Sequence, residues 1–156
     1  MGMHSLHQNI ERVQHISGAK TATVTPSNGV DLRDFVDGVD VLIHIGVVAN
    51  IANSPQPSWT FHFEESDSVS SGFTAVTNSD DVDIEGSLTP VTTPDSSTGV
   101  FLTIDAAAED DNTYRVGYLG SKRYLRVVAT AANTPGSTPI VVLVIGVPRL
   151  RPGADA

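Results

Sequence analysis

The sequence predicts an all-β protein, folded as one antiparallel β-sandwich of the jelly-roll or immunoglobulin-like kind. Only 17% of the 156 residues are charged, and Thr, Ser, Val, Gly and Asp are abundant. Short apolar runs alternate with Gly, Pro, Asn and Asp, and no long segment shows the 3.6-residue period of an amphipathic helix. About ten such runs follow one another at spacings of roughly 8–12 residues, which is typical of a sandwich or barrel.

The apolar runs give the expected strands in chain order. They are 10–16, 22–25, 40–48, 59–65, 73–76, 82–84, 100–104, 113–119, 124–130 and 140–147. Trp59, Phe61 and Phe63 alternate with polar residues, which predicts a strand with one buried face, and 113–119 alternates in the same way. The runs 124–130 and 140–147 are nearly continuous and rich in β-branched residues, which indicates central strands covered on both faces.

The connections between these runs carry turn residues. Ser66 and Asp67 followed by Gly72 predict one hairpin, because Ser and Asp side chains bond nearby backbone N–H groups and Gly tolerates a positive φ. The segment 117–124 predicts a second hairpin whose aromatic residues pair across the strands. Helix is expected only as single turns, at 31–36 and 105–110.

The two ends differ in composition from the middle of the chain. Residues 1–9 contain little apolar surface and are expected to form an extended N-terminal arm, while 10–148 form the sandwich domain and 149–156 a tail. No signal peptide is recognisable at 1–10, because it lacks a cationic start and a long apolar stretch. The longest apolar run, 39–51, is interrupted by Asp40, His44 and Asn50 and is too short to span a membrane.

The charge is negative and unevenly distributed. A net charge of −9 opposes binding to nucleic acid and to anionic membranes, both of which need clustered cations. No Lys or Arg occurs from Asp34 to Tyr114, and no Asp or Glu from Arg115 to Arg151. Either the two halves neutralise one another across the sheets, or the molecule presents one acidic and one basic surface to a charged partner.

Residue patterns for catalysis are weak. The chain has no cysteine, no G-x-S-x-G elbow and no phosphate-binding G-x-x-x-x-G-K-[ST] loop. An apparent calcium loop beginning at Asp81 has Thr92 in place of its final bidentate carboxylate. His44 and His62 lie within apolar strands, where a structural role is commoner than a catalytic one. We therefore expect no enzymatic activity, no cofactor and no metal.

Two stretches resemble a known family. The first is 59–67 together with 72–76, and the second is 114–130; Val30-Asp31-Leu32 and Pro148-Arg149 add to them. These residues resemble small proteins of tailed bacteriophages and prophages, encoded near the major capsid protein and of the capsid decoration (cement) type. The residues 68–71 enlarge a turn that is usually tight in that family, and 86–99 form an added loop.

The resemblance implies a virion structural protein that is made in the host cytoplasm and binds the outside of the assembled head. Its partner would be the major capsid protein, and the domain would self-associate as a dimer or trimer. Candidate partner-binding residues come from the arm and from the second motif, since Tyr and Arg are typical interface anchors. They are Leu6, Ile10, Arg12, Arg115, Tyr118, Lys122, Arg123, Tyr124 and Arg126.

Other roles remain open. Arg115, Arg123 and Arg126 are expected to lie near one another on the second hairpin, either facing the partner or pairing with acids of the same chain. A head–tail connector or tail structural protein is one alternative function. A carbohydrate-binding module is another, in which Trp59 would stack on sugars.

Overall fold

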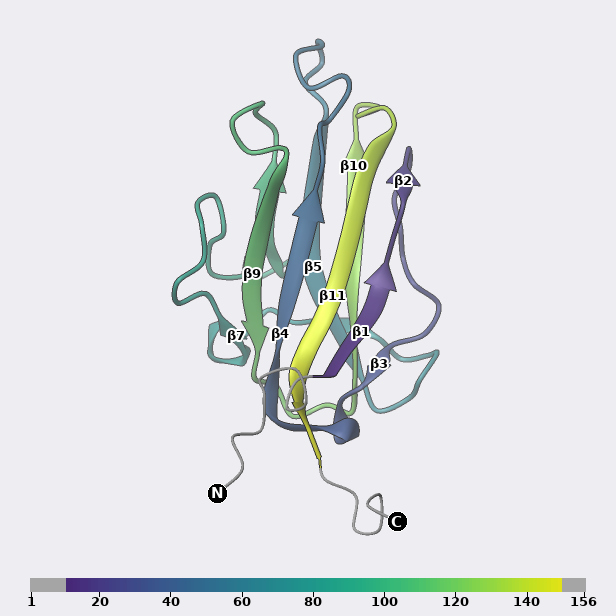
Figure 1. The fold of residues 1–156 in the computed structure, drawn as a ribbon, viewed down its shortest axis with the longest axis vertical. Coiled ribbons are helices and arrows are strands. Elements are labelled where there is room, and N and C mark those ends of the chain that lie inside the picture. Colours follow the sequence, from purple (N-terminus) through teal and green to yellow (C-terminus); the bar gives the residue numbers. More distant parts are fainter. Residues whose placement is uncertain (1–10, 150–156) are drawn as a thin grey trace, which may run out of the picture.

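The computed structural model describes residues 11–149 as two antiparallel β-sheets packed face to face (Figure 1), which confirms the predicted single β-sandwich. The first sheet has the order β1 (Glu11–Ile16), β11 (Thr138–Pro148), β4 (Phe35–Ile45), β9 (Asn112–Tyr118) and β7 (Val82–Asp83), with β2 (Ala19–Lys20) also on β11. The second has the order β3 (Val30–Asp31), β10 (Tyr124–Ala132), β5 (Ser58–Ser66) and β6 (Thr74–Ala75), with β8 (Val100–Ile104) also on β5.

The order of the strands is that of a jelly roll. Along the chain, β1, β4, β9 and β11 lie in the first sheet, and β3, β5, β8 and β10 lie in the second. The chain therefore changes sheet at almost every step, and the first and last strands, β1 and β11, are neighbours. In an immunoglobulin-like sandwich several consecutive strands share a sheet, so of the two predicted kinds the jelly roll is the one that fits.

Most predicted strands are present with shifted ends. The strand at 100–104 has the predicted bounds, and the predicted 40–48 is β4, which begins at Phe35 and ends at Ile45. Gly38 in β4 has a φ of +91°, so the strand is irregular at this point. The sequence pattern therefore did not predict the part of β4 that precedes residue 40. The predicted strand 22–25 is reduced to one bridge between Val24 and Ala129.

Helical structure is limited to two short 3-10 turns in the described residues, η2 (Leu32–Asp34) and η3 (Ser79–Asp81). The first falls in the predicted turn at 31–36, and the segment 105–110 forms turns without a helix. Of the two predicted hairpins, the one after Ser66 is confirmed, since β5 pairs with β6 and Gly72 has a φ of +67°. The second is wrong: β9 and β10 lie in opposite sheets, so 119–123 crosses between the sheets and Tyr118 does not pair with Tyr124.

The core lies between the sheets and contains the aromatic residues that alternation predicted. Trp59, Phe61 and Phe63 are fully buried. The indole Nε1 of Trp59 on β5 donates to Oγ1 of Thr138 on β11 at 3.1 Å, which joins the two sheets inside the core. β11 alternates between buried and partly exposed residues over most of its length, so the prediction that it is covered on both faces is wrong.

One end of the sandwich collects several connections. β1 and β4 begin there, β9 and β11 end there, and the crossing 119–123 closes it (lower end of Figure 1). The turn after β5 lies at the same end, because β5 runs antiparallel to β10 and pairs Ser66 with Tyr124. Within residues 11–149 no helix is long and apolar enough to cross a bilayer.

Candidate functional site

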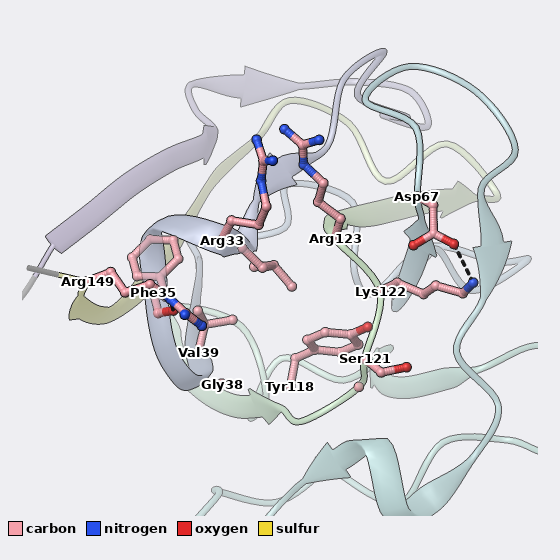
Figure 2. Close-up of a pocket in the computed structure, with 12 residues that line it drawn as sticks. Arg33, Phe35, Gly38, Val39, Asp67, Tyr118, Ser121, Lys122, Arg123 and Arg149 are labelled. Atoms are coloured by element: carbon pink, nitrogen blue, oxygen red, sulfur yellow. Dashed lines mark hydrogen bonds and ion pairs between the residues drawn. The ribbon is translucent and has the colours of Figure 1, made fainter. Parts of the chain in front are cut away.

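A pocket of about 300 Å³ lies at this end of the sandwich (Figure 2). Its floor is apolar and includes Phe35, Val39 and the ring of Tyr118, all of them buried. Its rim is cationic and more exposed. The rim cations are Arg33, Lys122, Arg123 and Arg149. We call this site the basic pocket, because it gathers four cations on a chain whose net charge is −9.

The segments that form the basic pocket are tied together by their backbones. The N–H of Leu32 donates to the carbonyl of Arg123 at 2.8 Å, and the N–H of Arg149 donates to the carbonyl of Asp34 at 2.7 Å. The turn η2 is capped by Asp31, whose carboxylate accepts from the N–H of Arg33 at 3.1 Å. These bonds fix the relative positions of η2, the crossing and the end of β11.

Two carboxylates hold three of the four rim cations, while Arg149 donates to the carbonyl of Phe35. Asp31 Oδ2 lies 2.8 Å from Nη2 of Arg123 and 3.2 Å from Nη2 of Arg33, so two guanidinium groups share one carboxylate. Lys122 donates to Asp67 at 2.6 Å on the opposite side of the basic pocket (Figure 2). This bond raises the pKa of Lys122 and lowers the pKa of Asp67, which keeps both groups charged near neutral pH.

Tyr118 anchors the floor. Its hydroxyl donates to the carboxylate of Glu65, and burial together with this bond raises the pKa of the Tyr118 phenol. Gly120 packs directly on the ring, where an added Cβ would overlap the phenol atoms. The crossing therefore needs glycine at this position to lie flat over Tyr118.

The structure brings together only some of the predicted partner-binding residues. Tyr118, Lys122 and Arg123 line the basic pocket. Tyr124 is buried beneath the guanidinium of Arg123, which lies 4.7 Å from the centre of its ring. Arg12 is exposed on β1, while Leu6 and Ile10 lie outside the described residues.

Arg115 and Arg126 have structural partners elsewhere. Arg115 on β9 bonds Asp40 of β4 at 3.1 Å, and Arg126 on β10 bonds Glu64 of β5 at 2.6 Å. The prediction that Arg115, Arg123 and Arg126 lie together is wrong for Arg115, because β9 and β10 belong to different sheets. Both pairs join a C-terminal cation to an acid of the cation-free stretch, so the two halves of the chain do neutralise one another in part.

Sequence reasoning missed two of the four rim cations, Arg33 and Arg149. Their signal was indirect: Arg33 directly follows Val30-Asp31-Leu32, and Arg149 belongs to Pro148-Arg149, the two short segments added to the two main motifs. Their convergence depends on the antiparallel pairing of β4 with β11, which brings residues more than a hundred positions apart to one end of the sheet.

The other candidate sites have structural explanations. Trp59 is buried and bonded to Thr138, so it offers no platform for a sugar. His44 Nδ1 lies 3.1 Å from Oγ1 of Thr113, and His62 Nε2 lies 3.4 Å from Glu64. Comparisons of the chain with protein-family models, with curated proteins and with solved structures found no match.

Proposed function

We propose that this protein is a virion structural protein that decorates the outside of an assembled bacteriophage head and stabilises it. The observation that carries the proposal is the composition of the basic pocket. Leu32, Asp67, the residues 120–123 of the crossing and Arg149 come from the four separate stretches that resemble small phage proteins, and all of them line this one pocket. The meeting of these four stretches at one place supports a shared binding role.

The fold suits a passive role of this kind. Jelly rolls occur in viral capsid proteins and also in lectins, so the architecture alone does not choose between them. Burial of Trp59 removes the feature that favoured a carbohydrate-binding module, which leaves the virion role better supported. A protein that binds only the assembled shell stabilises it by mass action, and many copies on one lattice add avidity.

The orientation follows from charge. The basic pocket gathers cations at one end of a molecule with a net charge of −9, so we propose that this end faces the major capsid protein. The remaining acidic surface would then face solvent. We further propose that the domain binds as a dimer or trimer around a symmetry axis of the shell.

Adding purified protein to heads that lack it tests the proposal. We expect saturable binding of hundreds of copies per head, and a higher temperature of shell disruption in differential scanning calorimetry. Heads already carrying the protein are the control and should bind no more. Binding of about a dozen copies would favour a head–tail connector, and absence of both binding and protection would refute the decoration role.

A further inference from the structure

We infer that the basic pocket binds an acidic segment of the partner protein in which an apolar side chain lies between carboxylates. The inference rests on the proposed function, because it names the chemistry by which the shell protein would be recognised. It is carried by the pairing of an apolar floor with a cationic rim in one preformed pocket.

The floor selects an apolar group. The apolar surface that the pocket still offers comes mainly from Leu32, which is only partly buried, because Phe35, Val39 and Tyr118 beneath it are 3%, 5% and 0% exposed. A volume of about 300 Å³ lies at the lower limit of ordinary ligand sites, which run to roughly 1,000 Å³. The pocket therefore accommodates one or two side chains of an extended segment.

The rim selects carboxylates. Three carboxylates, those of Asp31, Asp67 and Glu65, lie against the four rim cations, so these groups together leave a positive balance. The Arg33 side chain is 63% exposed, and Arg149 is also exposed although its Nε donates to the carbonyl of Phe35 at 3.1 Å, so both guanidinium groups retain N–H donors for a further partner. The planar fork of arginine matches a carboxylate in two parallel hydrogen bonds.

A protein segment fits better than a nucleic acid. A nucleic-acid backbone would be repelled by the acidic remainder of the molecule, and four cations confined to one pocket form no extended track for its phosphates. The buried apolar floor would gain nothing from a sugar–phosphate chain. The backbone bonds of Leu32 and Arg149 hold the pocket in place before binding, which lowers the ordering cost of capturing a segment.

A synthetic peptide of alternating glutamate and leucine is the probe, with binding measured by isothermal titration calorimetry. Amide NMR shifts are expected to map to Ser121, Lys122 and Arg123. Replacing glutamate by lysine in the peptide should abolish binding, and replacing leucine by serine should weaken it about tenfold. Binding that tolerates either change would refute the inference.

Arg33→Gln and Arg115→Gln form a matched pair of protein variants. Both arginines are largely exposed and each bonds one aspartate, but only Arg33 lines the basic pocket. Arg33→Gln leaves Asp31 bonded to Arg123, so the pocket should stay intact. We expect it to weaken peptide binding about fivefold, against less than twofold for Arg115→Gln. Equal effects would overturn the inference.

The same pair separates this inference from the proposed function. If wild-type protein coats heads and Arg33→Gln coats them equally well, the shell contact lies elsewhere and the inference fails, while decoration stands. If the peptide binds with the expected variant effects but no head is coated, the peptide-binding site stands and decoration fails.

Discussion

The imidazole of His15 lies in surroundings that disfavour its charged form. It lies on β1, and its Nε2 is buried without a hydrogen-bond partner in the part of the chain that the structure describes. Burial, and secondly the charge of Arg126, lowers the pKa of His15 from 6.5 to about 4. The imidazole is therefore neutral in the folded protein at pH values where it is protonated in the unfolded chain.

This shift predicts a pH-dependent contribution to stability. Above pH 6.5 the histidine is neutral in both states, and between pH 6.5 and 4 the unfolded state takes up a proton that the native state does not. The native state should lose about 3 kcal/mol over this window. His15→Leu removes this titration. The free energy of unfolding in urea, taken as variant minus wild type, should therefore rise by about that amount as the pH falls from 7.5 to 4.

His44→Leu is the control for His15→Leu, because His44 also lies on a strand but has Thr113 as a partner. Comparing each variant with wild type at every pH cancels the titration of carboxylates common to all three proteins. Parallel pH profiles for wild type and His15→Leu would contradict the assignment.

Single residues were predictable where a period-two pattern determines their burial. Trp59, Phe61 and Phe63 alternate with polar neighbours, and the structure buries all three. Arg33 and Arg149 were not predictable, because each lies outside an alternating strand and lines the basic pocket only through the pairing of distant strands.

Among the elements, β5 and β11 are connected by a polar contact that the hydrophobic pattern does not reveal. The Trp59–Thr138 hydrogen bond joins opposite sheets, and both residues have no exposed surface. A buried indole N–H that loses its acceptor costs about 1–3 kcal/mol. The bond therefore fixes how the upper end of β11 sits over β5, in addition to the apolar packing.

A double-mutant cycle measures this contact. Thr138→Val keeps the shape of the side chain and should lower the free energy of unfolding by about 1–3 kcal/mol. Trp59→Phe should also destabilise, but Thr138→Val should cost much less in that background, since no N–H remains to be satisfied. Additive effects in chemical denaturation would show that the two residues are not coupled.

The error at β9 and β10 shows what strand patterns leave open. Two apolar runs joined by a short glycine-containing segment have the same local sequence whether they form a hairpin or cross between sheets. Here Gly120 lies against the ring of Tyr118 and carries the chain to the other sheet. Turn residues predict a change of direction, and only the pairing partners decide which sheet follows.

At the scale of the whole molecule, the exposed ion pairs contribute little to the stability of the fold. Three of the six ion pairs in the described residues, Arg33–Asp31, Arg115–Asp40 and Lys122–Asp67, are well exposed, and such pairs contribute about 0–1 kcal/mol each. The Arg126–Glu64 pair is better shielded, with side chains 15% and 19% exposed, and His62 contacts the same carboxylate. The jelly roll itself depends on contacts such as β1 with β11, which no local pattern in the sequence specifies.

A change of salt concentration should therefore affect the stability of the fold and the binding of the acidic peptide to different extents. Raising NaCl from 0.05 to 1 M should change the free energy of unfolding by less than about 1 kcal/mol, because weakened ion pairs and relieved self-repulsion oppose one another. The same change should weaken binding of the acidic peptide at least about tenfold. A large fall in the urea midpoint would show that surface charge pairs sustain the fold.

The antiparallel pairing of β1 with β11 places Glu11 and Arg149 at the same end as the basic pocket, whereas the turn between β10 and β11 lies at the far end (Figure 1). An affinity tag or fluorescent protein joined directly before Glu11 or directly after Arg149 would lie beside the pocket and would crowd whatever docks there. A foreign epitope inserted after Thr134 would instead project away from a docked surface, so that turn is the position from which the scaffold could display cargo.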